Sequence, residues 1–247
     1  MKTATAQISF EFNAAPALPN VPALAPAVDP IDDVDIDDHD DTARELLKVI
    51  DRVHDAIHDF GAFRRSCDVW WALLQRHQIN GEERYLEAIK GMPRPALDAL
   101  AQGFGILIRH FCGEGRYCDI LGRVYMEISS NWGRGHLGQF FTPWSLAMLM
   151  AQTQIGDQAA PVNAEGEPLS ISDCACGAGV MLLAARGVVA SRWGRRAASR
   201  LRLYGQDIDG VCVTMAKIQI QLTDDRFTVP YLQLWAHEVA LARKAAA

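Results

Sequence analysis

The chain has 247 residues, of which 49% are hydrophobic, and a formal net charge of -6. No stretch reaches the roughly 20 apolar residues that span a bilayer. The first twelve residues lack the pattern of a signal peptide, and the six cysteines include no C-x2-C pair. We therefore expect a globular cytoplasmic protein with reduced thiols, without a membrane span, a metal site or a disulfide framework.

The first 41 residues differ in composition from the rest. They contain an Ala/Pro-rich stretch, 13–28, and an Asp-rich stretch, 29–41, and hold eight Asp, one Glu and one Lys. Neither stretch can bury a core, so we expect residues 1–41 to form a disordered tail. The Asp run is open to two interpretations, a DNA mimic or docking tail and a solubilising linker, and like-charge blocks favour the linker. The remainder has a small positive charge, so the acidic total is weak evidence against nucleic-acid binding.

Residues 42–136 carry the pattern of an all-helical region. An amphipathic stripe follows a capping-box pattern that begins near Thr42; its members are Leu46, Ile50, Val53, Ile57 and Phe60. Further helices are expected over 66–78, 82–91, 95–112 and 119–129. Pro93 and Pro95 separate two of them, because proline is tolerated only in the first turn of a helix.

The pattern changes to alternating strands and helices in residues 137–247. We expect helices over 145–154, 180–189 and 211–222, and strands over 169–173 and 201–207. A small-residue turn, 174–179, joins the first strand to its helix. This order is typical of the opening of a parallel α/β sheet.

Three motifs in this part carry candidate chemistry. The turn Asp173 to Gly179 follows a strand and opens a helix, so its small residues allow a ligand to approach the backbone closely. Asp207 ends the next strand, where a carboxylate can bind two ribose hydroxyls, and Asp209 can cap the following helix. Gly138 to Pro143, with the sequence GQFFTP, is a shaped loop before a helix.

A run of arginines between the two strands has two interpretations. It could contact phosphates, or it could be a solvated helix end and loop, which is the commoner case. The arginines are Arg186, Arg192, Arg195, Arg196, Arg200 and Arg202.

The order of these motifs resembles that of N6-adenine DNA methyltransferases, most closely the modification subunits of type I restriction systems. The stretch Asp119 to Tyr125, DILGRVY, and Met215 to Lys217 also resemble that family, so the resemblance covers roughly residues 117–224. It implies a partial Rossmann-like parallel sheet, 137–247, that uses S-adenosylmethionine. It also implies a DNA substrate with a flipped adenine, and a specificity or complementary methyltransferase subunit as partner.

The resemblance also implies roles for individual residues. Gln139, Phe140, Phe141, Thr142 and Pro143 would wrap the methionine end of S-adenosylmethionine. Asp173 and the turn residues Cys176, Gly177, Ala178 and Gly179 would hold its amino-acid portion, and Asp207 would bind its ribose hydroxyls. Two positions depart from the family pattern: Cys174 stands where proline is usual, and Val180 stands where a further glycine is common.

One family motif is absent from the sequence. These enzymes read the flipped adenine with an Asn/Asp-Pro-Pro-aromatic loop, and no such motif occurs in the chain, which ends 40 residues after Asp207. We therefore expect an incomplete domain whose catalytic loop comes from a partner or a neighbouring gene product, or is replaced by an unrecognised substitute. Two alternatives stay open: a non-catalytic S-adenosylmethionine-binding protein that modulates restriction and modification, and a methyltransferase with another substrate.

Overall fold

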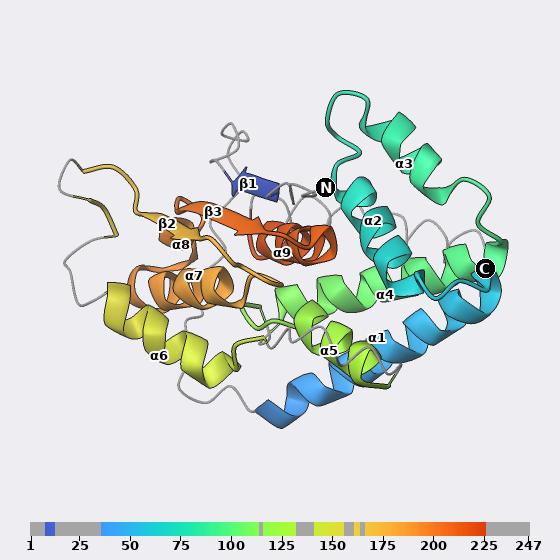
Figure 1. Ribbon diagram of the computed structural model, residues 1–247. Helices are drawn as coiled ribbons and strands as arrows, with labels where there is room; N and C mark the ends of the chain where they lie inside the picture. The colour runs from blue at the N-terminus through green and yellow to red at the C-terminus, as the bar shows by residue number, and fades with distance from the viewer. Residues whose placement is uncertain are drawn as a thin grey trace, which may run out of the picture.

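A computed structural model describes residues 8–12, 36–113, 116–131, 141–155, 161–163 and 166–225 (Figure 1). These residues form a small sheet of order β1-β3-β2 and a larger number of helices. Strand β2 (Ser170–Asp173) runs parallel to β3 (Arg202–Asp207), and β1 (Ile8–Phe12) runs antiparallel to β3. The parallel register places Asp173 beside Gly205, so the carboxyl ends of β2 and β3 lie at the same edge of the sheet.

Two helices pack on one face of the sheet. They are α7 (Val180–Trp193), which follows β2, and α9 (Gly210–Leu222), which follows β3. Helix α6 (Trp144–Ile155) lies against α7, and the short α8 (Arg195–Ala198) leads into β3 (Figure 1). The strands alternate accordingly: Leu203 is buried under the helices, whereas Ser170 and Ser172 are exposed on the opposite face.

The helical region packs on α9 rather than standing apart. It contains α1 (Ile36–Ile57), α2 (Ala62–Leu74), α3 (Gly81–Ile89), α4 (Arg94–Cys112) and α5 (Leu121–Asn131). Helix α1 lies along α4, and α2 and α5 contact α9. One buried hydrophobic cluster joins residues of α1, α2, α4 and α5 to Met215 and Leu222 of α9. The helical region and the sheet-bearing region therefore share a core.

The structure has the expected order of strands and helices, and most elements begin and end within a few residues of the expected positions. Two features differ in the N-terminal stretch that was expected to be disordered. Residues 8–12 form β1, and α1 begins at Ile36 rather than near Thr42. The sheet that is present is a parallel pair with one antiparallel strand, in a mainly helical molecule. In the described part of the chain, no helix combines the length and apolar character needed to cross a membrane.

Candidate cofactor site

At two positions of the turn between β2 and α7, the backbone has a conformation that only glycine adopts readily. Gly177 has φ +52° and Gly179 has φ +94°, both in the left-handed region. The Cys176 amide donates to the Gln206 carbonyl of β3 at 2.8 Å, and the Gly179 amide donates to the Cys176 carbonyl at 2.7 Å. A Cβ atom on Gly179 would lie 3.1 Å from the Cβ of Ala216, so this glycine also lets α7 approach α9 closely.

Asp207 ties the turn to the end of β3. Its Oδ2 accepts a hydrogen bond from the Gly177 amide at 2.9 Å, and its Oδ1 accepts one from the Asp209 amide at 2.9 Å. Each carboxylate oxygen has a second lone pair, so the side chain keeps the capacity to accept hydroxyl donors. Asp173, at the end of β2, accepts from the Ala175 amide at 3.0 Å. Both aspartates are only partly buried and lie at the same sheet edge.

The loop before α6 reaches this turn through an aromatic side chain. A Cβ atom on Gly177 would lie 2.9 Å from Cε1 of Phe141, so the Phe141 ring lies directly against the turn backbone. Thr142 is partly buried and Pro143 is exposed, and the Pro143 carbonyl accepts from Ala147 in the first turn of α6. Gln139 and Phe140 lie outside the described residues. Two motifs that are 36 residues apart in the sequence therefore meet at Gly177.

Tyr125 of α5 extends this contact toward Asp209. Its ring lies 5.9 Å from the Phe141 ring, and its hydroxyl donates to Oδ2 of Asp209 at 3.4 Å. Asp209 caps α9, because its Oδ1 accepts from the Val211 amide at 2.9 Å, which confirms the capping interpretation. Tyr125 lies inside the DILGRVY stretch of the resemblance, which implies no role for it. An aromatic residue one turn inside an expected helix is the only sequence signal for this contact.

Gln219 of α9 is the second residue without a role in the sequence analysis. It is fully buried, and its side-chain amide donates to the Ala178 carbonyl of the turn and to Oδ1 of Asp119, both at 2.8 Å. Its Oε1 accepts from the amides of Ile120 and Leu121 at 2.9 and 3.0 Å. A glutamine on a mainly apolar helix such as α9 signals a buried polar contact, but the sequence does not say to what.

Burial keeps the cysteines of the site in the thiol form. Burial, together with the neighbouring Asp173 and Asp207 carboxylates, raises the pKa of the Cys176 thiol to about 12. Burial, followed by Asp209 and Asp207, also raises the pKa of Cys212 at the start of α9. Both cysteines therefore act as small apolar groups at neutral pH, since the thiolate is the reactive form.

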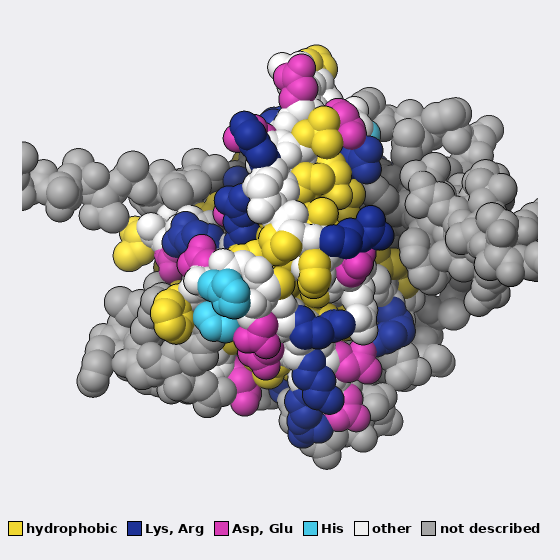
Figure 2. Space-filling model, turned by 90° about the vertical axis from the view of Figure 1, so that its right-hand side faces the viewer, with side chains coloured by type: hydrophobic (Ala, Val, Ile, Leu, Met, Phe, Trp, Pro, Cys, Tyr) yellow, Lys and Arg dark blue, Asp and Glu magenta, His cyan; other side chains and the backbone are white. Residues whose placement is uncertain are grey.

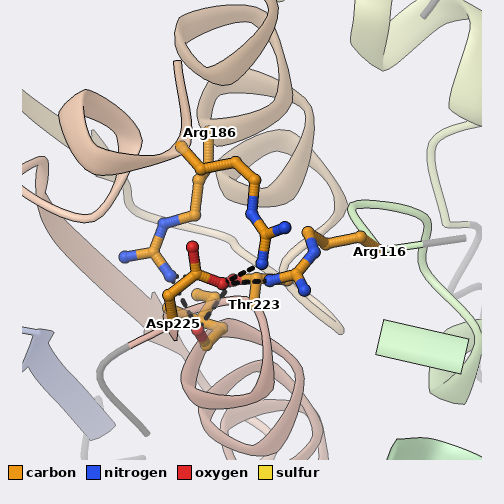
Figure 3. Close-up of polar contacts among 6 residues, drawn as sticks. Arg116, Arg186, Thr223 and Asp225 are labelled. Carbon is orange, nitrogen blue, oxygen red and sulfur yellow. Dashed lines mark hydrogen bonds and ion pairs between the residues drawn. The ribbon is translucent and has the colours of Figure 1, made fainter. Parts of the chain in front are cut away.

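The arginine run between β2 and β3 does not form one continuous surface. Arg186 is 1% exposed and donates to the Ile220 carbonyl and to Thr223 Oγ1 at the end of α9 (Figure 3). Arg195 pairs with Asp225, and Arg202 pairs with Glu167 at 2.9 Å. The exposed members are Arg192, Arg196 and Arg200. Half of the run therefore serves the fold itself rather than a phosphate backbone.

Charges of both signs are mixed on the side of the molecule that carries α3. Figure 2 shows Lys and Arg interspersed with Asp and Glu over this face. Exposed ion pairs such as Lys90–Glu87 and Arg94–Asp98 belong to α3, α4 and their connection. The described residues of this face therefore carry no single-sign field of the kind that binds DNA non-specifically. Among the described residues, no group of three His, Cys, Asp or Glu side chains is arranged to hold a metal ion.

Comparison with known proteins gives one positive result. Residues 116–228 match the family described as N-6 DNA Methylase. Neither the curated proteins nor the solved structures gave a match. The matched range begins at Arg116, before α5, and includes the Phe141 loop, the turn, Asp207 and the whole of α9. Residues 116–228 of this chain are thus similar to the N-6 DNA methylase family, as the resemblance implied.

Proposed function

We propose that this chain binds S-adenosylmethionine at the turn between β2 and α7 and serves the N6 methylation of adenine in DNA. The observation that carries the proposal is the meeting of three separate motifs at Gly177. The Phe141 ring lies against its Cα, and the Asp207 carboxylate accepts its amide hydrogen. The family match supplies the reaction class, adenine-specific DNA methylation.

The chemistry of the site fits this cofactor better than a phosphate-bearing one. The polar side chains gathered at the turn are the carboxylates Asp173 and Asp207. A helix N-terminus such as that of α7 can bind phosphate, but adjacent carboxylates repel it. S-adenosylmethionine carries one carboxylate, but its sulfonium, its ammonium and its two ribose hydroxyls are all groups that carboxylates favour. The exposed small residues Cys174 and Ala175 leave the turn backbone open to such a ligand.

In this proposal each group of the site has a separate task. Asp207 accepts the ribose hydroxyls while holding the turn, and Asp173 with Cys176, Gly177, Ala178 and Gly179 holds the amino-acid portion. Phe141, together with Gln139, Phe140, Thr142 and Pro143, shields the methionine end from water. When bound, the cofactor supplies an electrophilic methyl group.

The groups that read the target base are proposed to lie outside these 247 residues. No Asn/Asp-Pro-Pro-aromatic motif occurs in the 247 residues, and family enzymes use such a loop to hold a flipped adenine. We therefore propose that a partner subunit of a restriction-modification system provides the loop and the recognition of a DNA sequence. The same absence favours a second candidate, a non-catalytic S-adenosylmethionine-binding protein that modulates such a system.

Calorimetric titration of S-adenosylmethionine into the purified chain tests the binding step. Wild-type protein should bind, and Asp207→Ala should weaken binding at least about tenfold, because two hydroxyl contacts are lost. Asp209→Ala is the matched control. It removes the cap of α9, costs about 1 kcal/mol of stability, and should change affinity much less. Equal affinity in Asp207→Ala and wild type would refute the ribose assignment.

Transfer of tritiated methyl groups to unmethylated DNA separates the two candidate functions. Label recovered as N6-methyladenine with the chain alone would show that it contains an adenine-reading group of another kind. Label that appears only after addition of a complementary subunit would support the partner-dependent enzyme. Cofactor binding without label in either case would favour the non-catalytic protein.

A further inference from the structure

A single buried side chain joins the candidate cofactor turn to the helical region. Gln219 uses all four of its amide hydrogen-bonding positions: two donated bonds, to Ala178 and Asp119, and two accepted bonds, from Ile120 and Leu121. The two accepted bonds satisfy amides at the start of α5, which would otherwise lack partners. The bond to Ala178 reaches the turn backbone between the two left-handed glycines.

Asp119 completes the link from the side of the helical region. It is buried, and its Oδ1 also accepts from the Gly122 amide at 2.7 Å. A Cβ atom on Gly122 would lie 2.1 Å from Oδ2 of Asp119, so only glycine fits beneath this carboxylate. Burial raises the pKa of Asp119, while the bonds from Gln219 and Gly122 lower it. The start of α5 is thus tied to the turn by one closed polar network.

The same helix touches the other half of the site one turn later. Tyr125 contacts the Phe141 ring and donates to Asp209. Helix α5 therefore braces the turn through Asp119 and Gln219, and braces the aromatic loop through Tyr125. Movement of α5 would displace both parts of the site together.

We propose that Gln219 is a positioning residue that sets the shape of the turn and couples it to α5. The proposal rests on the assignment of this turn as the cofactor site. Buried polar networks that are fully satisfied specify one arrangement of the groups they join. Loss of the Gln219 amide leaves the Ala178 carbonyl and the α5 amides without their buried partners, so the turn opens more often while the rest of the core stays packed.

Gln221 provides a matched control on the same helix. It is also buried, at 2% exposure, and its side chain bonds to Gln75 at 2.7 Å and to the Leu74 carbonyl at 3.5 Å. Both glutamines therefore hold α9 to a neighbouring segment, but only Gln219 contacts the turn. Gln219→Met and Gln221→Met should both lower stability, because each removes buried hydrogen bonds.

The decisive measurement compares alkylation rates of two buried thiols in the native protein. Cys176 lies in the turn at 3% exposure, and Cys67 lies in α2 at 1% exposure. All proteins carry Cys174→Ser, so that label on the turn reports Cys176 alone. Gln219→Met should raise the ratio of the Cys176 rate to the Cys67 rate about tenfold, the effect expected when one buried hydrogen bond that resists local opening is lost. Gln221→Met should leave that ratio near the wild-type value.

Titration of S-adenosylmethionine into the same proteins provides the second readout. Gln219→Met should bind more weakly than Gln221→Met at a temperature where both are folded, in proportion to the fall in the fraction of molecules whose turn is closed. An unchanged thiol ratio in Gln219→Met, or an equal rise in Gln221→Met, would overturn the positioning role. If wild-type protein does not bind the cofactor, the proposed function fails, and the thiol ratio still decides whether Gln219 shapes the turn.

A double exchange covers the case in which Gln219→Met does not fold. In Asp119→Asn with Gln219→Glu, the carboxylate introduced at position 219 accepts from the amide introduced at position 119 and from the start of α5, but it donates nothing to Ala178. Stability should recover relative to Gln219→Glu alone, whereas the raised Cys176 ratio should remain. Recovery of both would show that the bond to Ala178 has no role in shaping the turn.

Discussion

Burial decides the acid–base behaviour of single cysteines in this protein. Cys118, just before α5, is 5% exposed. The pKa of its thiol is raised from 9.0 to about 12, chiefly by burial, and this net value includes a lowering by Arg123 and a raising by Asp119. The folded protein therefore keeps this proton in a pH range where the unfolded chain releases it. Alkaline conditions then favour the unfolded state through the linkage of proton release to unfolding.

The resulting prediction concerns stability above about pH 9. The contribution of Cys118 is fully present below the unfolded pKa and is lost as the pH rises toward 12. Cys118→Ala should therefore reduce the loss of unfolding free energy between about pH 8 and pH 10 by about 1 kcal/mol. Urea titrations at each pH measure this. Cys174→Ala, which alters an exposed thiol, should keep the wild-type slope, and an equal change in both variants would contradict the prediction.

Single residues also show which roles a local sequence pattern predicts and which it does not. Asp209 was expected as a cap from its type and place before a helix, and it caps α9. Arg186 was grouped with neighbouring arginines by charge alone, yet its guanidinium is buried against the end of α9. A charged residue is normally solvated, so burial of this arginine follows from tertiary packing that a local pattern does not contain.

At the scale of elements, the C-terminal end of α9 is held by charge. Arg116, from the segment after α4, donates to Oδ1 of Asp225 at 2.7 Å (Figure 3). Arg195 of α8 pairs with the same oxygen. The Arg116 side chain is 9% exposed and that of Asp225 is 29% exposed. Breaking such a pair leaves a largely buried guanidinium without its counter-ion, which costs more than the pair contributes.

Asp225→Ala should consequently lower the unfolding free energy by about 2 kcal/mol. Asp98→Ala is the matched control, because Asp98 pairs with Arg94 at 2.8 Å with both side chains more than half exposed. That substitution should cost less than about 0.5 kcal/mol. Chemical denaturation at low and high salt measures both. Similar costs for the two variants would mean that the Asp225 pairs do not hold α9.

The positions of helices and strands were predicted best, because the sequence signals for them are local. Proline positions, capping residues and the spacing of apolar side chains located α2 to α9 apart from the short α8. Strand β1 was missed although Ile8, Phe10 and Phe12 alternate with polar residues, which is a strand signal. The residues that follow it, 13–28, are rich in Ala and Pro, and this composition predicts disorder. That signal opposed the strand signal of the alternating residues. Its pairing with β3, almost 200 residues later, is non-local and cannot be read from the sequence.

At the scale of the whole molecule, the sheet is covered on one face by α7 and α9 (Figure 1). The register pairs Ser170 with Arg202 and Ile171 with Leu203, so polar and apolar residues separate onto opposite faces. The sequence of a strand that is buried on both faces is instead a nearly continuous run of apolar residues. The described sheet is thus built for one layer of helices, and a doubly wound Rossmann-like arrangement is not present among the described residues.

The helical region and the sheet-bearing region share one hydrophobic cluster, and this predicts a single unfolding transition. Trp70 of α2 is 1% exposed, and its indole donates to the Leu100 carbonyl of α4 at 3.0 Å, within the cluster that includes Met215 of α9. Trp70→Phe should therefore lower the midpoint of the whole transition, because the lost packing destabilises both regions. Calorimetry should give equal van't Hoff and measured enthalpies for both proteins. Two separable transitions, with only one moved by Trp70→Phe, would show instead that the regions fold independently.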